Sequence, residues 1–85
     1  MTYRLVLKPA AERDLAAVPR EILRRLDVRI RSLAHEPRPR DAMELAGPDP
    51  LYRLRVGDYR ILYDVSDQEK VVRVARVRHR REAYR

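Results

Sequence analysis

The sequence predicts a single α+β domain over residues 1–85, in which two helices pack on one face of a mainly antiparallel sheet. The first observation is that apolar and charged residues alternate over 52–65 around one two-residue turn, which is typical of a β-hairpin. The second is that apolar residues recur every three or four positions over 9–36, which indicates helices. The third is a β-favouring stretch near each end of the chain. Together these give the order β-α-α-β-β-β, with a three-strand C-terminal meander.

The first half of the chain predicts a short strand followed by an αα-hairpin. Residues 3–7 are apolar and β-favouring, and Pro9 then stands where the first turn of a helix tolerates proline. A second amphipathic helix runs from about Pro19 to Glu36. Its apolar residues are Leu23, Leu26, Ile30 and Leu33. Because so few residues join the two helices, we expect them to pack antiparallel.

The expected hairpin turns at Gly57 and Asp58 and separates apolar from basic side chains. Its cross-strand pairs are Val56 with Tyr59, Leu54 with Ile61, and Tyr52 with Tyr63. These six residues share one face, because paired residues of antiparallel strands point the same way. The opposite face carries Arg53, Arg55 and Arg60. Glycine at the first turn position fits a type II′ turn.

A further strand is expected over residues 71–77. Val72 and Val74 alternate correctly, but Val77 is out of phase with them. We therefore expect a β-bulge, or the end of the strand, near Arg76.

The arginine face is the strongest indication of function. Like charges at neighbouring sheet positions repel each other and gain nothing for folding, and an ordinary solvated face mixes both signs. Arg78 or Arg80 extends this face from the last strand and tail, and His79 and Tyr84 stand among the same cations. Neighbouring cations favour a neutral imidazole and an ionised phenolate, which suits proton transfer at neutral pH. The pattern favours a groove that holds a phosphodiester.

The composition agrees with a polyanionic partner. The chain has 20 basic and 13 acidic residues, for a net charge of +7. Lys8 and Lys70 are the two lysines, so arginine supplies the other 18 basic residues, and its planar guanidinium suits bidentate contacts to phosphate. The sequence has no cysteine for disulfides or cysteine metal sites, and no apolar run approaches the ~20 residues that span a bilayer. We expect a cytoplasmic protein with no membrane partner.

The stretch LYRLRVGDYRILYDV and the C-terminal VVRVARVRHRREAYR resemble the RelE/ParE superfamily of small toxins from prokaryotic toxin–antitoxin pairs. The resemblance covers essentially the whole chain, and HRREAYR favours the RelE-like branch. It implies the same β-α-α-β-β-β fold. It also implies a ribosome-dependent endoribonuclease that cuts mRNA in the A site. In that family mechanism the ribose 2′-OH attacks the adjacent phosphate, without metal or other cofactor.

The resemblance also implies roles for individual residues. It implies catalytic roles for Arg60, Arg80 and Tyr84 and phosphate binding by Arg53 and Arg55. The arginine pattern itself adds His79 to the expected catalytic residues and Arg78 to the expected phosphate-binding residues. Some relatives carry lysine where this chain has Arg53 and Arg55, and arginine cannot serve as a base. Proton transfer would therefore fall to His79 or Tyr84, or catalysis relies on electrostatics and on positioning by the ribosome.

A cognate antitoxin, the ribosome and mRNA are the partners that the resemblance implies, with operator DNA bound only by the toxin–antitoxin complex. Two other interpretations share the fold. One is a ParE-like toxin that poisons DNA gyrase and cuts no RNA. The other is a non-catalytic binding module that acts as a co-repressor with its antitoxin.

Overall fold

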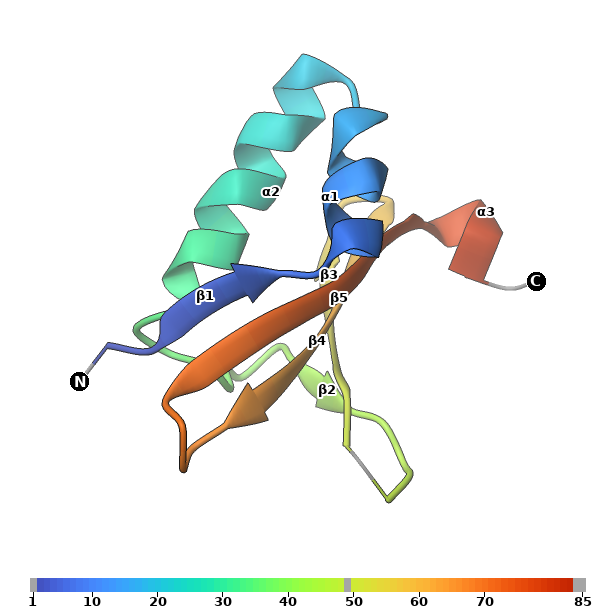
Figure 1. The fold of residues 1–85 in the computed structure, drawn as a ribbon. Coiled ribbons are helices and arrows are strands. Elements are labelled where there is room, and N and C mark those ends of the chain that lie inside the picture. Colours follow the sequence, from blue (N-terminus) through green and yellow to red (C-terminus); the bar gives the residue numbers. More distant parts are fainter. Residues whose placement is uncertain (1, 49, 84–85) are drawn as a thin grey trace.

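The computed structural model describes residues 2–48 and 50–83 and consists of a five-stranded sheet with two helices on one face and a short third helix after the last strand (Figure 1). The elements are β1 (Arg4–Leu7), α1 (Pro9–Ala16), α2 (Arg20–Ser32), β2 (Met43–Glu44), β3 (Tyr52–Val56), β4 (Tyr59–Ser66), β5 (Val71–His79) and α3 (Arg80–Ala83). The sheet order is β1-β5-β4-β3-β2, with β1 parallel to β5 and the other pairs antiparallel. The predicted fold class is confirmed.

The second helix ends earlier than its apolar pattern predicts. Helix α2 stops at Ser32, and the chain then continues in tight turns in which Leu33, Ala34 and His35 each donate to the carbonyl three residues earlier. Proline disfavours the α conformation for the residue before it, so Pro37 prevents the helix from extending through Glu36. None of the helices in the described part of the chain has the length and apolarity needed to cross a bilayer.

The hairpin has the predicted register. Val56 pairs with Tyr59, Leu54 with Ile61, and Tyr52 with Tyr63. Gly57 has a φ of 59°, whereas Asp58 does not have a positive φ, as a type II′ turn requires. This turn matches the twist of the two strands, and so it fixes which side chains share a face.

The predicted bulge lies in β5. Leu62 pairs with Arg76 and Tyr63 with Val74, so Ala75 is the extra residue. The insertion turns Val77 to the same face of the strand as Val74. Accordingly, Val77 is 3% exposed and lies in the same core as the fully buried Val74. The strand therefore continues past the irregularity to His79.

The core lies between the helices and the apolar face of the sheet. Leu26 of α2 and Leu33, the residue directly after the helix, pack against Leu54, Ile61 and the valines of β5. Tyr63 is fully buried, and its hydroxyl donates to the Pro37 carbonyl at 2.8 Å. Burial raises the pKa of Tyr63 to about 12. The helices thus cover one face and leave the arginine face open.

Candidate nucleic-acid interface

Three arginines form a row across adjacent strands on the face of the sheet away from the helices. Arg55 of β3 pairs with Arg60 of β4, which pairs with Arg78 of β5. Arg60, in the middle, is 7% exposed and is the only charged side chain that is buried among the described residues. Placing like charges side by side disfavours folding, so this row is an arrangement suited to an anion.

A pocket of about 250 Å³ opens beside this row. It is lined by Arg55, Gly57, Asp58, Tyr59, Arg60 and Arg80. Arg80 is the first residue of α3, and its backbone N–H donates to the Asp58 carbonyl at 2.6 Å. That bond ties the start of α3 to the hairpin turn. Three of the predicted site arginines, Arg55, Arg60 and Arg80, are thereby brought to one cavity.

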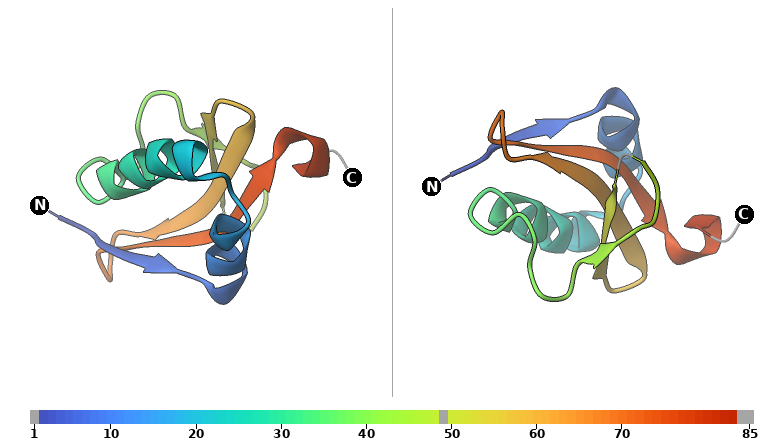
Figure 2. Two further views of the ribbon diagram at one scale, coloured as in Figure 1. Left: turned by 90° about the horizontal axis from the view of Figure 1, so that it is seen from above. Right: turned by 90° about the horizontal axis from the view of Figure 1, so that it is seen from below.

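Helix α3, which begins with Arg80, lies at one end of the molecule. In both panels of Figure 2, α3 projects beyond the end of β5, at the opposite end of the molecule from the loop that follows α2. The Arg80 guanidinium lies 3.8 Å from the Asp58 carboxylate, and both side chains are about two-thirds exposed. Such an exposed pair contributes little to stability. Asp58 is the acidic residue among those that line the pocket, whereas the sequence pattern indicates only its place in the turn.

Arg53 lies one row away from the pocket. It pairs with Leu62, and its Nη2 is 3.2 Å from the Sδ of Met43 on β2. Met43 is 53% exposed. Arg53 therefore extends the basic face toward β2, but it does not line the cavity that holds Arg60.

His79 lies on the other face of the sheet. It pairs with Tyr59, and the two rings meet edge to face with centroids 5.1 Å apart. Successive residues of a strand point to opposite faces, so His79 cannot share the face of Arg78. It instead lines a separate pocket with Pro19 and Ile22. The expectation that His79 stands in the arginine groove is wrong. Tyr84, the other predicted proton-transfer group, lies outside the described residues.

A contact that the sequence did not reveal holds the bulge of β5. The Asp14 carboxylate on α1 accepts hydrogen bonds from Arg76 Nε at 2.8 Å and from Arg76 Nη2 at 3.2 Å. It also accepts the backbone N–H of Val77 at 2.9 Å. No sequence pattern identifies this contact, because Asp14 lies 62 residues from Arg76. It fixes the strand from which Arg78 and Arg80 follow.

The described residues include no cluster of three or more histidine or acidic side chains able to hold a metal ion. The geometry provides a set of cations and backbone groups at the turn of the hairpin. This arrangement is able to bind a phosphodiester.

Comparisons with known proteins identify the family. A family model described as the ParE toxin of the type II toxin–antitoxin system parDE matches residues 5–84. A chain of the archaeal RelE–RelB complex from Pyrococcus horikoshii OT3 is 35% identical, with a TM-score of 0.84, over 94% of this chain and 97% of that one. A chain of the toxin–antitoxin complex RelBE2 from Mycobacterium tuberculosis is 30% identical, with a TM-score of 0.83, over 94% and 93%.

A sequence relative agrees with these structures. A protein of Methanocaldococcus jannaschii described as toxin RelE1 is 26% identical over 88 residues, which cover 100% of this chain and 98% of that protein. The family match spans nearly all of the sheet and both long helices, and the two structural matches each cover 94% of the chain. The chain therefore belongs to the RelE/ParE superfamily and is a RelE-like toxin of a toxin–antitoxin system.

Proposed function

We propose that this toxin is a cytoplasmic endoribonuclease that cuts mRNA on the ribosome and needs no metal ion. Cleavage of the mRNA stops translation. The observation that carries the proposal is the meeting of Arg55, Arg60 and Arg80 in one polar pocket. Fixed cations of this kind stabilise a phosphate that gains negative charge as its strand is cut. The likeness to chains of RelE-containing complexes supports the same activity.

In the proposed reaction, a bond forms between the ribose 2′-oxygen and the neighbouring phosphorus, and the bond from phosphorus to the next 5′-oxygen breaks. The 2′-hydroxyl loses its proton to a base, and the departing 5′-oxygen gains a proton. The products are a 2′,3′-cyclic phosphate and a 5′-hydroxyl. Buried Arg60 anchors the reacting phosphate, and Arg80 neutralises its developing charge. Arg53, Arg55 and Arg78 bind the phosphate backbone on either side.

Proton transfer needs a group other than arginine, because arginine stays protonated at usable pH. With His79 on the other face of the sheet, we assign proton transfer or base stacking to Tyr84, as the family resemblance implies. Positioning of the reacting nucleotide by the ribosome supplies the rest of the rate enhancement in this proposal.

The proposed protein partner is a cognate antitoxin that silences the toxin. The structural relatives come from RelB–RelE and RelBE2 toxin–antitoxin complexes, which supports such a partner. Operator DNA is proposed as a ligand of that complex only.

A second candidate function is poisoning of DNA gyrase, and the description of the matching family model, a ParE toxin, favours it. One experiment separates the two. Purified toxin is added to ribosome-bound mRNA, with primer extension to map breaks, and in parallel to gyrase with supercoiled DNA. Breaks at codon-related positions in mRNA alone support the ribonuclease. Gyrase-trapped DNA breaks with intact mRNA would overturn it.

A further inference from the structure

The carboxylate of Asp58 opens into the phosphate pocket from the hairpin turn. Asp58 is the second of the two turn residues, and its side chain is 65% exposed. Its backbone carbonyl accepts the Arg80 N–H at 2.6 Å, which ties this part of the turn to the start of α3. The carboxylate is therefore accessible to a ligand in the pocket, while the backbone that carries it is held by a hydrogen bond.

The Asp58 carboxylate differs from the other aspartate carboxylates in the described part of the chain. Each of the others accepts a hydrogen bond from an arginine at 2.8 or 2.9 Å; these residues are Asp14, Asp27, Asp41, Asp64 and Asp67. Asp58 accepts no hydrogen bond at its carboxylate from any residue that the structure describes. It lies 3.8 Å from Arg80 Nη1, which is beyond hydrogen-bonding distance. Its lone pairs are therefore available to a substrate hydroxyl.

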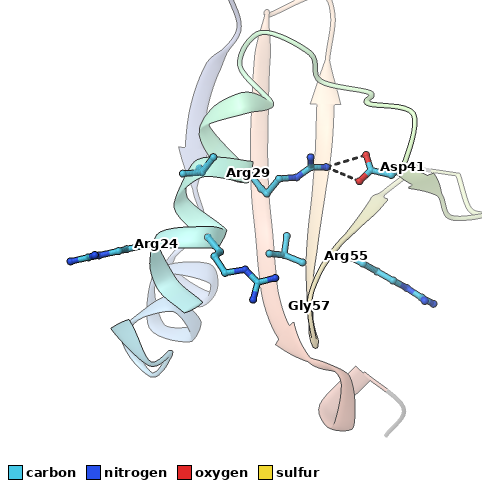
Figure 3. A pocket seen from close by; sticks show the side chains of 8 residues that line it. Arg24, Arg29, Asp41, Arg55 and Gly57 are labelled. Atoms are coloured by element: carbon cyan, nitrogen blue, oxygen red, sulfur yellow. Dashed lines mark hydrogen bonds and ion pairs between the residues drawn. The ribbon is translucent and has the colours of Figure 1, made fainter. Parts of the chain in front are cut away.

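Asp41 shows the contrasting arrangement. It lines the groove beside β3, a cavity of about 530 Å³ that α2 borders. Figure 3 shows the Asp41 and Arg29 side chains pointing toward each other, and Arg29 Nη2 donates to both carboxylate oxygens, at 2.8 and 3.0 Å. In the same view the Arg55 side chain points away from this groove. Asp41 is thus a bonded acid outside the phosphate pocket and a suitable control for Asp58.

The other residues that line the phosphate pocket are poorly suited to take a proton from a ribose hydroxyl. Three are arginines, which stay protonated at usable pH, and Gly57 has no side chain. Tyr59 borders the pocket, but its ring meets the His79 ring edge to face on the helix side of the sheet. An ionised carboxylate accepts protons, and aspartate is one of the side chains that act as general bases. Asp58 is therefore the lining residue whose chemistry fits a base.

We propose that the Asp58 carboxylate is the base that accepts the 2′-hydroxyl proton, an inference that rests on the proposed function. One carboxylate oxygen takes the proton as the 2′-oxygen bonds to phosphorus and the bond from phosphorus to the 5′-oxygen breaks. The 5′-oxygen receives its proton from a separate donor, the role left to Tyr84 or to a water molecule. After the products leave, Asp58 returns its proton to water, and the carboxylate is restored.

The charges of the pocket suit a carboxylate that works beside a phosphate. Asp58 brings one negative charge, whereas Arg55, Arg60 and Arg80 bring three positive charges to the same cavity. The pocket therefore stays cationic toward a phosphodiester even though it contains an ionised carboxylate. In this arrangement the arginines bind the phosphate and stabilise its developing charge, and Asp58 acts on the adjacent sugar.

The test compares Asp58→Asn with wild-type toxin in single-turnover cleavage of ribosome-bound mRNA. Asparagine keeps the size of the side chain and suits a turn, but its amide does not take up the proton. We expect cleavage to slow at least about a hundredfold, which is typical of the loss of a general base. The affinity for a fluorescent RNA oligonucleotide should stay equal or rise, because a negative charge beside the phosphate is gone.

The possible results separate this inference from the proposed function. Cleavage by Asp58→Asn at the wild-type rate would overturn the role of Asp58 and leave the ribonuclease proposal standing. Slower cleavage with an equal loss of RNA affinity would show that Asp58 shapes the binding site, and the assignment as base would be wrong. Intact mRNA with the wild-type toxin would reject both proposals.

Two further variants separate the carboxylate from the shape of the turn. Asp58→Glu keeps a carboxylate on a longer side chain and should cut at least about tenfold faster than Asp58→Asn. Asp41→Asn removes the same charge from the groove beside β3 and should cut at the wild-type rate. A glutamate variant as slow as the asparagine variant, or an equal loss of rate in Asp41→Asn, would contradict the assignment.

A sulfur-substituted substrate distinguishes a base from an acid. In an mRNA that has sulfur in place of the bridging 5′-oxygen at the cut site, the leaving group departs without a proton. The 2′-hydroxyl must still lose its proton, so Asp58→Asn should cut this mRNA at least about a hundredfold more slowly than wild-type toxin does. If the sulfur restores Asp58→Asn to the wild-type rate, Asp58 acts on the leaving group and is not the base.

Discussion

The Asp14 carboxylate on α1 binds the backbone N–H of Val77 on β5 at 2.9 Å, immediately after the bulge that sets the phase of the C-terminal strand. Strand β1 pairs with β5 only as far as Val74, so β1 offers no acceptor for the Val77 N–H. The Asp14 carboxylate supplies that acceptor. A helix residue thus replaces a neighbouring strand. Because Arg78 and Arg80 follow directly, the contact links the αα-hairpin to the arginine pocket.

The first prediction concerns this contact. Asp14→Asn should lower the free energy of unfolding by about 1–3 kcal/mol, because it weakens the hydrogen bonds of a part-buried backbone donor and guanidinium. Asp27→Asn is the control, since Asp27 forms an exposed ion pair with Arg31 and should cost at most about 0.5 kcal/mol. Urea unfolding measures both. Equal losses would contradict a special role for Asp14.

The same carboxylate gives a pH dependence. Burial favours the protonated form of Asp14, but hydrogen bonds from Arg76 and Val77 and the charges of Arg76 and Arg78 outweigh it, so the pKa is lowered. A group with a lowered folded-state pKa stabilises the protein above its ordinary value of 3.8 and loses that contribution as pH falls through the folded-state value. The stability difference between wild type and Asp14→Asn should therefore shrink below pH 3.8. A difference that stays constant down to pH 2 would contradict this account.

A third prediction concerns the far end of the sheet. Hydrogen bonds from Arg38 and Tyr3 lower the pKa of Asp67 to about 2, and Arg38 also donates to the Tyr52 hydroxyl at 2.8 Å. The Asp67 carboxylate signal should titrate near pH 2 in an NMR experiment. In Arg38→Ala its midpoint should rise toward the ordinary 3.8, since the largest cause of the shift is gone. An unchanged titration midpoint in Arg38→Ala would show that the contact between Arg38 and Asp67 is not formed in solution.

The fourth prediction is the salt dependence of RNA binding. The logarithm of affinity should fall linearly with the logarithm of salt concentration, and Arg55→Ala or Arg78→Ala should each reduce the slope by about 0.7, the value for one phosphate contact to a single strand. Arg13→Ala, a cation on α1, should leave the slope unchanged. Fluorescence anisotropy at several salt concentrations measures it. Unchanged slopes in the sheet variants would remove these arginines from the RNA interface.

Local rules predicted the hairpin well, because a two-residue turn leaves one register and so places Arg55 against Arg60. The break in the apolar alternation between Val74 and Val77 likewise predicted the bulge. The same alternation places His79 and Tyr59 on the helix side of the sheet. The prediction that His79 joins the arginine face instead followed from the arginines that surround it in the sequence. The alternation of side chains between the two faces of a strand does not apply to Arg80, because α3 begins there. The Arg80 N–H donates to the Asp58 carbonyl in the hairpin turn.

Contacts between distant parts of the chain could not be predicted. The bond between Asp14 and Arg76 joins residues whose sequence surroundings give no sign of each other. The groove beside β3 depends on where β2 stops pairing, which a loop rich in proline does not indicate. These features come from the packing of α1 and α2 against the sheet.

The chemical structure of the cut RNA end distinguishes the proposed cleavage reaction from any other. Ribosome-bound mRNA is treated with wild-type toxin, Arg60→Ala or Arg80→Ala, and the 3′ end of the upstream fragment is analysed by mass spectrometry. The account predicts a 2′,3′-cyclic phosphate, formed at least about a hundredfold more slowly by either variant, as expected when a fixed charge on the transition state is lost. Arg13→Ala should cut at the wild-type rate. Intact mRNA with the wild-type toxin, a 3′-hydroxyl end, or undiminished cutting by both variants would contradict it.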